Sequence, residues 1–129
     1  MIAVTYVSAS NVAGDIAEVL RIRDQAITRN KANGVTGVLY CDSEFFFQVL
    51  EGERAEVLST MRRICRDRRH KDVNVIDGKD IEVRRFKNWS MKFVSGISNP
   101  AMSQRFDRRS LLNCDRNYLT ARLLELAEM

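Results

Sequence analysis

The stretch "EFFFQVLEG", residues 44–52, places a single glutamine, Gln48, among three phenylalanines, a valine and a leucine. Aromatic and β-branched residues favour a β-strand, whose side chains point alternately to its two faces. The two faces carry Phe46, Gln48 and Leu50 on one side and Phe45, Phe47 and Val49 on the other. Both faces are apolar, so we predict a central strand covered on both sides. A buried amide without partners costs about 1–3 kcal/mol, so Gln48 requires hydrogen-bond partners inside the core.

The bulk composition describes a single compact domain. The chain has 129 residues, 45% of them hydrophobic and 29% charged, which suffices for a core in a soluble protein. No stretch approaches the roughly 20 apolar residues of a membrane span, and residues 1–10 lack the basic region of a signal peptide. Three widely spaced cysteines, Cys41, Cys65 and Cys114, form no CxxC pair. We therefore expect free thiols in a cytoplasmic protein, without a metal site or a membrane contact.

Five segments have strand patterns and two have clear helix patterns. The first helix begins at Asp15, a suitable N-cap with Glu18 three residues on, and ends at Gly34, which suits the left-handed position after a helix. The second helix lies within residues 52–72. The predicted strands are 2–8, 35–41, 45–51, 73–76 and 89–96. The order βαββαββ predicts an α+β, ferredoxin-like sheet with both helices on one face.

The segments after the third strand carry weaker patterns. The apolar stripe expected on the second helix comprises Val57, Leu58, Met61, Ile64 and Cys65. Residues 77–80, "DGKD", are expected to form a turn, and residues 81–86 an extended segment or loop. In the tail, 101–128, "NCD" at 113–115 separates two short helices, and one helix face carries Leu119, Leu123 and Leu126. We expect these helices to cover the second face of the sheet or a neighbouring subunit.

A basic run, "RRICRDRRHKD" at 62–72, allows three interpretations. It can form a solvated helix end, a phosphate or pyrophosphate site, or a nucleic-acid surface. The RNP-type motif of RNA-binding sheets is absent and Phe45–Phe47 are expected in the core, so we expect no nucleic-acid partner. The single histidine, His70, has no serine or cysteine arrangement near it in sequence, which leaves hydrolytic catalysis unsupported.

Three polar residues are predicted at the centre of the apolar frame: Tyr6 on the first strand, Asn30 at the end of the first helix and Gln48 on the third strand. The first and third strands are the central neighbours of a ferredoxin-like sheet. Tyr6 and Gln48 can therefore lie side by side, both facing the helices. Such an arrangement suits a planar heteroaromatic ligand placed between the two helices, with donors and acceptors along its edge.

Several separated motifs give the chain a resemblance to BLUF domains, the blue-light sensors that use FAD. The motifs are "TYVS" (5–8), "RNKANGVTGVLY" (29–40), "FFQVLEGE" (46–53), "RRICRDRRH" (62–70) and "RRFKNWSMKF" (84–93). Together they cover residues 2–95 in the family's order. The resemblance implies a sensor domain over residues 1–96 and a helical extension over 97–129, as in the short, stand-alone members of the family.

The resemblance also implies roles at the photoactive centre. Tyr6 matches the tyrosine that donates an electron and a proton to the photoexcited flavin, and Gln48 matches the glutamine that bridges this tyrosine and the flavin N5/C4-carbonyl edge. Asn30 matches the asparagine that bonds the C4-carbonyl and N3 region, and Arg63 matches a basic residue at the C2-carbonyl side. A glutamine amide is both donor and acceptor, so Gln48 can flip or change tautomer and reverse its contacts.

The remaining site residues fall into three groups by the same resemblance. The aliphatic pair that sandwiches the isoalloxazine is Ile22 and Ile64. The residues beside the ribityl and phosphate portion are Asp67, Arg69 and His70. The output pair on the last strand is Trp89 and Met91, which alternation places on one face. Two positions, Arg29 and Glu44, depart from the common family pattern, and neither is expected to touch the tyrosine–glutamine pair.

The implied function is light sensing without substrate turnover, so we expect no enzyme activity. The expected cofactor is FAD, although FMN and riboflavin would make the same ring contacts. The expected partners are a downstream protein and further copies of the chain. Two other classes remain open. One is a light-independent, ferredoxin-like ligand-binding module, and the other is a conventional flavin oxidoreductase, for which no substrate acid/base pair is evident.

Overall fold

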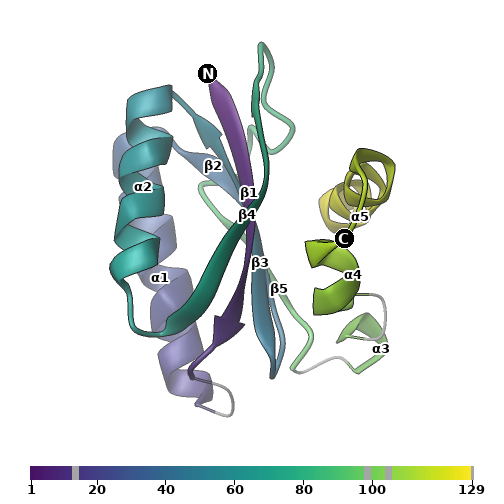
Figure 1. Ribbon diagram of the computed structural model, residues 1–129. Coiled ribbons are helices and arrows are strands. Elements are labelled where there is room, and N and C mark those ends of the chain that lie inside the picture. Colours follow the sequence, from purple (N-terminus) through teal and green to yellow (C-terminus); the bar gives the residue numbers. More distant parts are fainter. Residues whose placement is uncertain (13–14, 98–99, 104–105, 129) are drawn as a thin grey trace.

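The computed structural model describes residues 1–12, 15–97, 100–103 and 106–128, and it consists of one sheet between two helical layers (Figure 1). The strands are β1 (Ile2–Ser10), β2 (Thr36–Cys41), β3 (Phe45–Gly52), β4 (His70–Asp80) and β5 (Lys92–Ser95). The helices are α1 (Ile16–Asn33), α2 (Arg54–Arg66), α3 (Pro100–Ser103), α4 (Arg108–Leu112) and α5 (Arg116–Glu128). This order confirms the predicted ferredoxin-like α+β fold.

The sheet has the strand order β4-β1-β3-β2-β5, with β3 at its centre. β1 pairs antiparallel with β3 and β4, and β2 pairs antiparallel with β3 and parallel with β5. Helices α1 and α2 cover one face of the sheet, and α4 and α5 lie against the other (Figure 1). Tyr6 stands directly opposite Gln48 in the β1–β3 register. The predicted neighbourhood of these two residues is therefore confirmed.

β3 divides its side chains between two hydrophobic cores, as its alternation predicts. Phe46 and Leu50 belong to the core beneath α1 and α2, whereas Phe45, Phe47 and Val49 belong to the core beneath α4 and α5. All eight residues of the strand are buried, as expected of a central strand. Burying one such side chain contributes about 1.5–3 kcal/mol, so this strand contributes to the stability of both faces. None of the three phenylalanine rings is available for base stacking.

Both ends of α1 lie where the sequence predicts them. The Asp15 carboxylate accepts a hydrogen bond from Glu18 N at 3.1 Å, which caps the first turn. Gly34 adopts a left-handed conformation with φ of 68°, and its N–H donates to Asn30 O. Asn30 O also accepts from Val35 N at 2.9 Å. These bonds fix Asn30 at the point where the helix turns into β2.

The buried face of α2 is narrower than the predicted stripe. Its buried residues are Val57, Thr60 and Met61. The prediction is wrong for Leu58, which is 38% exposed, and for Cys65, which is also exposed. Positions 57, 60, 61 and 64 lie on one helical face. Because Thr60 is polar, the apolar pattern in the sequence does not indicate that position 60 belongs to this face. Leu58 and Cys65 lie on the flank of the helix.

β4 is longer than predicted and includes the expected turn at 77–80. Residues 77–80 pair with Thr5, Val4, Ala3 and Ile2 of β1, so the predicted turn is wrong. β4 is an edge strand, and its polar side chains reach water while its backbone bonds are made to β1. The pairing shifts register twice, and Asp72 within it has a positive φ of 53°. Polar composition therefore concealed a strand of this length.

β5 is shorter than predicted, because the segment before it is hydrogen-bonded to two other elements, β2 and α1. Trp89 O accepts from Gly37 N at 3.2 Å, and Ser90 O accepts from the Asn30 side chain at 3.0 Å. Trp89 is 37% exposed and Met91 only 5%. The prediction that both lie on one face of the last strand is wrong, since regular strand structure begins at Lys92.

The C-terminal helices cover the second face of the sheet. This is the first of the two predicted arrangements, the other being a contact with a neighbouring subunit. The residues predicted on one helix face, Leu119, Leu123 and Leu126, are all buried in the core of that face. The predicted separation of two helices at 113–115 is confirmed, and the short α3 precedes them. Across the described residues, no helix is both long enough and apolar enough to cross a membrane.

Candidate functional site

A cleft lies between α1 and α2 above the sheet. Leu39 of β2 and Gln48 of β3 form its floor, and its empty space out to the mouth is ≈ 500 Å³. All residues predicted to bind a cofactor line it: Ile22, Asn30, Gln48, Arg63, Ile64, Asp67, Arg69 and His70. The fold therefore brings residues from α1, β3, α2 and β4 to one place, although they are spread over almost fifty positions of the chain.

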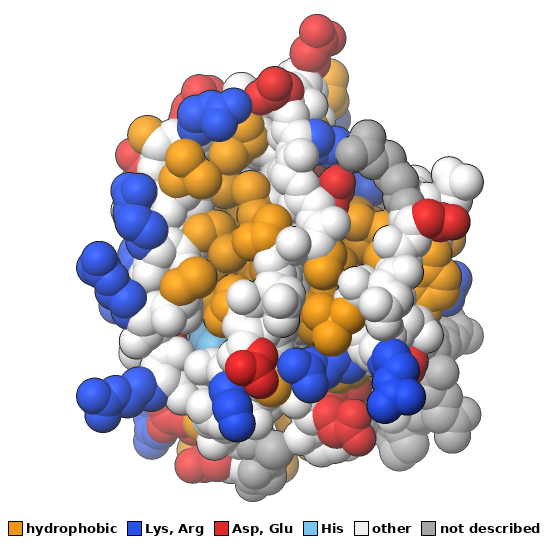
Figure 2. Space-filling model, viewed as in Figure 1, with side chains coloured by type: hydrophobic (Ala, Val, Ile, Leu, Met, Phe, Trp, Pro, Cys, Tyr) orange, Lys and Arg blue, Asp and Glu red, His pale blue; other side chains and the backbone are white. Residues whose placement is uncertain are grey.

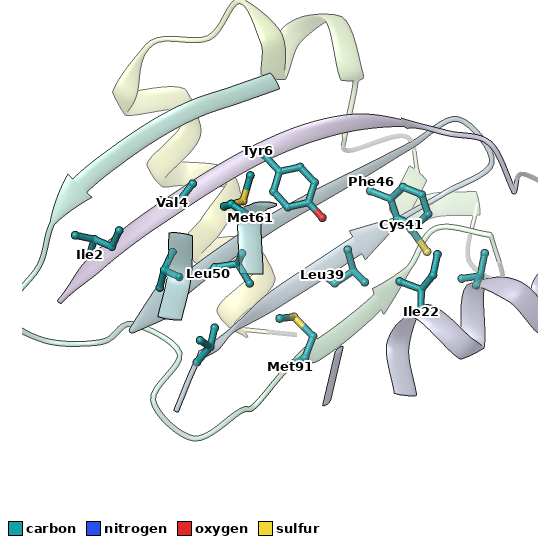
Figure 3. Close-up of a cluster of buried hydrophobic side chains, with 13 residues drawn as sticks. Ile2, Val4, Tyr6, Ile22, Leu39, Cys41, Phe46, Leu50, Met61 and Met91 are labelled. Carbon is teal, nitrogen blue, oxygen red and sulfur yellow. The ribbon is translucent and has the colours of Figure 1, made fainter. Parts of the chain in front are cut away.

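Tyr6 and Gln48 form a hydrogen-bonded pair at the floor. The Tyr6 hydroxyl donates to Gln48 Oε1, and Gln48 Nε2 donates to Met91 Sδ at 3.3 Å. Figure 3 shows the Tyr6 hydroxyl pointing away from β1 on the side where Leu39 and Met91 lie. Burial raises the pKa of Tyr6 far above its ordinary value, and the Asp67 carboxylate raises it further, so the hydroxyl keeps its proton. Both ends of the Gln48 amide are thus satisfied within the protein.

Asn30 is a second buried amide on the edge of the same cleft. It is 2% exposed, and its Nδ2 donates to Ser90 O at 3.0 Å. Gln48 and Asn30 therefore contact two consecutive residues, Met91 and Ser90, in the segment before β5. A rearrangement of either amide would change the contacts of that segment.

Aliphatic side chains form the two walls of the cleft. Ile22 of α1 is buried, and Ile64 of α2 is partly buried and packs against the same core. Ala26 lies on the α1 wall beside Ile22. The cleft is therefore apolar on both sides and polar along the edge formed by Gln48 and Asn30.

Arg69 links α1 to the loop before β4 across the mouth of the cleft. Its Nη2 donates to Asp67 Oδ2 at 2.6 Å and to Gln25 Oε1 at 2.8 Å, and its Nη1 donates to Glu18 Oε1 at 3.2 Å. The hydrogen bonds from Arg69 hold the pKa of Asp67 below its ordinary value. Arg63, another arginine of the mouth, makes no ion pair with any described residue.

His70 closes the cleft at the start of β4. It is 9% exposed, and its Nδ1 lies 2.8 Å from Ser8 Oγ. Burial lowers the pKa of His70 to about 4; the Asp67 carboxylate opposes this shift, and the Arg69 charge adds a smaller lowering. The imidazole is therefore neutral near pH 7.

Sequence reasoning missed several residues of the site. Gln25 lines the cleft and follows Ile22 at i+3 on α1, and Glu18, which accepts from Arg69 at the mouth, precedes Ile22 by four residues. That helical spacing was sufficient to find them. Thr60 and Leu39 also line the cleft, but neither carries a sequence pattern that points to it. Conversely, the predicted output residue Trp89 packs on Phe86 and lies under Lys92 Nζ, 4.4 Å from its ring, away from the cleft amides.

Residues 1–92, which include the whole cleft and the segment before β5, match a family model named BLUF and described as sensors of blue-light using FAD. The chain belongs to the BLUF family. The motif-based resemblance is thereby confirmed, and with it the function of the family, blue-light sensing through a flavin.

The curated relatives of this BLUF chain are much longer proteins, and the match covers a small part of each. It is 33% identical over 84 residues to the photoactivated adenylate cyclase subunit alpha of Euglena gracilis, which is 65% of this chain and 8% of that protein. It is 35% identical over 90 residues to the subunit beta, which is 67% of this chain and 10% of that protein. The BLUF chain thus spans a tenth or less of these relatives.

Solved BLUF structures match almost the entire chain. The photo-activated state of BlsA has a TM-score of 0.85 at 28% identity, covering 99% of this chain and 95% of that chain. The dark state of BlrB, a BLUF protein, has a TM-score of 0.84 at 29% identity, covering 99% and 96%. The similarity therefore includes the C-terminal helices as well as the sheet.

The cleft of this BLUF chain suits a flavin ring. An isoalloxazine is flat, apolar on both faces, and carries carbonyl and N–H groups along one edge. Ile22 and Ile64 supply aliphatic walls on the two sides, and Gln48 and Asn30 supply amide donors and acceptors at the edge between them. The chemistry of the side chains present therefore fits the cofactor that the family uses.

Proposed function

We propose that this chain binds FAD in the cleft between α1 and α2 and that blue light rearranges the Tyr6–Gln48 pair. One observation carries the proposal: Tyr6 donates to Gln48 Oε1 while Gln48 Nε2 donates to Met91 Sδ. A single amide thus connects a buried tyrosine, the cleft and the segment before β5. FMN and riboflavin present the same ring and are expected to bind as well.

The chain's residues divide the binding task by their chemistry. Ile22 and Ile64 bound the faces of the ring, and Gln48 and Asn30 bond its polar edge. Arg63 provides a cationic donor on the carbonyl side. The tail of the cofactor extends toward the residues at the mouth, which are Asp67, Arg69 and His70. Arg69 is bonded to two carboxylates, so a phosphate there competes with Asp67 and Glu18.

A bound flavin supplies the absorption of blue light and an excited state that accepts an electron. Tyr6 is the electron and proton donor of the site, because its hydroxyl is protonated and already directed at Gln48 Oε1. Gln48 responds by turning its amide or by changing tautomer. A turned amide presents Oε1 to Met91 Sδ, and a thioether cannot donate to it, so the Gln48–Met91 contact is lost. Gln48 is 4% exposed, so its amide is shielded from bulk water at the floor of the cleft.

The output passes through Met91 first and Trp89 second. Met91 contacts Gln48 directly, whereas Trp89 lies two residues away and is partly exposed. A change at Met91 shifts the segment that Gly37 and Asn30 hold by hydrogen bonds to Trp89 O and Ser90 O. We therefore propose that Met91 detects the state of Gln48 and that Trp89 presents it to a partner protein.

The rest of the chain serves this output. We take residues 1–96 as the sensor and 97–129 as a helical extension, whose buried leucines connect it to the sheet. Signalling to a protein partner, with self-association and without substrate turnover, is the activity we propose. All three cysteines are free, which supports a reducing, cytoplasmic location.

An absorption spectrum tests the proposal. Purified chain mixed with FAD should retain a yellow, resolved flavin spectrum, and blue light should shift its bands slightly to the red, reversibly in darkness. Gln48→Leu should retain the flavin and lose the shift, because leucine can neither donate nor accept. A chain that takes up no flavin would favour a light-independent ligand-binding module, and a wild-type shift in Gln48→Leu would refute the role of Gln48.

A further inference from the structure

His70 is the only histidine of the chain, and three neighbours fix its ring. Its centroid lies 4.5 Å from that of Phe46 and 6.0 Å from that of Tyr6, with the Tyr6 ring at 68° to it. Its Nδ1 lies 2.8 Å from Ser8 Oγ, a contact between residues 62 positions apart. The ring lines the cleft, and its Nε2 makes no hydrogen bond to any described residue.

The Ser8 hydroxyl decides which nitrogen of this ring carries the proton. Ser8 is 0% exposed, and His70 Nδ1 is the one hydrogen-bond partner of its side chain among the described residues. A hydroxyl has one hydrogen to donate. If Nδ1 carried a proton and donated to Ser8, the buried Ser8 hydrogen would be left without an acceptor, which costs free energy. Ser8 therefore donates to Nδ1, and the proton of the neutral ring sits on Nε2.

We propose that Ser8 is a positioning residue that fixes His70 as the Nε2–H tautomer, so that the ring offers one N–H donor to an oxygen of the ligand in the cleft. The ligand half of this inference rests on the proposed flavin function, whereas the tautomer half does not. Ser8 occupies the last position of the "TYVS" segment, two residues after Tyr6 and on the same face of β1. A flavin in the cleft would offer its ribityl hydroxyls and, in FMN or FAD, its phosphate as such oxygens.

Because the chain has one histidine, nitrogen NMR of the ligand-free protein tests the tautomer directly. In chain labelled with ¹⁵N-histidine at neutral pH, we expect a protonated Nε2 and an unprotonated Nδ1. Ser8→Ala should turn these two resonances into those of a tautomer mixture, and Ser8→Thr, which keeps the hydroxyl, should restore them. Ser10→Ala is the matched control. Ser10 lies on the same strand opposite His70, but its hydroxyl accepts from Val12 N, so the ring resonances should not change.

Flavin titration tests the second half of the proposal. Ser8→Ala should weaken riboflavin or FMN binding about fivefold, as the loss of one ordered hydrogen bond does. Equal weakening for both flavins places the acceptor on the ribityl chain, and weakening for FMN alone places it on the phosphate. Unchanged affinity for both flavins would overturn this half of the proposal.

The two halves fail separately. A wild-type ring with its proton on Nδ1, or a folded Ser8→Ala variant with wild-type ring resonances, would overturn the tautomer assignment whether or not flavin binds. If Ser8→Ala does not fold, the wild-type spectrum alone decides. A chain with the expected tautomer that binds no flavin would instead refute the proposed function and leave the role of Ser8 in place.

Discussion

The molecule contains two fully buried tyrosines on opposite faces of the sheet, and their surroundings differ in one decisive way. Tyr6 donates to the neutral amide of Gln48 beneath the cleft. Tyr40 donates to the Asp42 carboxylate at 2.9 Å in the core beneath α4 and α5. Burial raises the pKa of both hydroxyls far above the ordinary value, and the Asp42 bond raises that of Tyr40 further. Depth and protonation state therefore do not distinguish the two.

The two tyrosines differ in the hydrogen-bonding capacity of the side chain that accepts from each hydroxyl. Gln48 has a donor and an acceptor, contacts Met91 with its second end and lines the cleft. Asp42 is an acceptor only, and its other oxygen already accepts from Glu44 N at 2.8 Å and Phe45 N at 3.1 Å, which fixes the β2–β3 turn. Tyr6 therefore bonds to a side chain that can exchange donor and acceptor, whereas Tyr40 bonds to a carboxylate whose hydrogen bonds hold a turn in place.

The molecular surface around β4 is largely apolar beside the strand. Apolar side chains gather on both sides of β4, between the sheet and the flanking helices, while lysines and arginines lie toward the margins (Figure 2). The exposed large apolar residues of α2 and β4 are Leu58 and Val75, respectively. The edge strand itself is interrupted by register shifts, which disfavour its pairing with another strand.

Truncation of neighbouring phenylalanines on β3 should give the largest effects. Phe46→Ala and Phe47→Ala each remove a ring that is 0% exposed, and each should lower the free energy of unfolding by about 3–5 kcal/mol. Only Phe46→Ala should also weaken flavin binding, because Phe46 packs on His70 in the cleft whereas Phe47 belongs to the other core. Urea unfolding and flavin titration measure the two quantities, and equal loss of flavin affinity in both variants would erase the contrast between the faces.

Acid should destabilise the cleft face through His70. Its pKa is lowered from 6.5 to about 4 in the folded chain, so the unfolded chain binds a proton first. Stability is then fully present above pH 6.5 and falls by up to about 3 kcal/mol as the pH drops toward 4. Urea midpoints across this range should fall less steeply for His70→Gln. Equal pH slopes for the two proteins would show that the folded ring titrates normally.

Loss of the Asp42 carboxylate should have a smaller effect, confined to the second face. Asp42→Ala leaves the Tyr40 hydroxyl and two backbone N–H groups without this acceptor, which should cost about 1–3 kcal/mol of unfolding free energy. The flavin spectrum and its light-driven shift should be unchanged. A variant that remains folded but loses the shift would place the second face in the photoresponse.

Sequence patterns were sufficient for the parts of the molecule that depend on local order. Strand alternation around Gln48 identified both cores, and Asp15 and Gly34 marked the ends of α1. The remaining features of the site depend on hydrogen bonds between residues far apart in the sequence. His70–Ser8 joins residues 62 positions apart and Arg69–Glu18 joins residues 51 apart, and neither contact leaves a periodic pattern. β4 was misjudged because an edge strand tolerates polar residues that a central strand excludes.

The most direct test of the contrast between the tyrosines compares Tyr6→Phe with Tyr40→Phe, both loaded with the same flavin. Each change removes one buried hydroxyl from an otherwise unchanged ring. The measurement is the difference absorption spectrum between blue-light and dark states. We predict no red shift in Tyr6→Phe and a wild-type shift in Tyr40→Phe. A wild-type shift in Tyr6→Phe, or its loss in a flavin-bound Tyr40→Phe, would contradict the account.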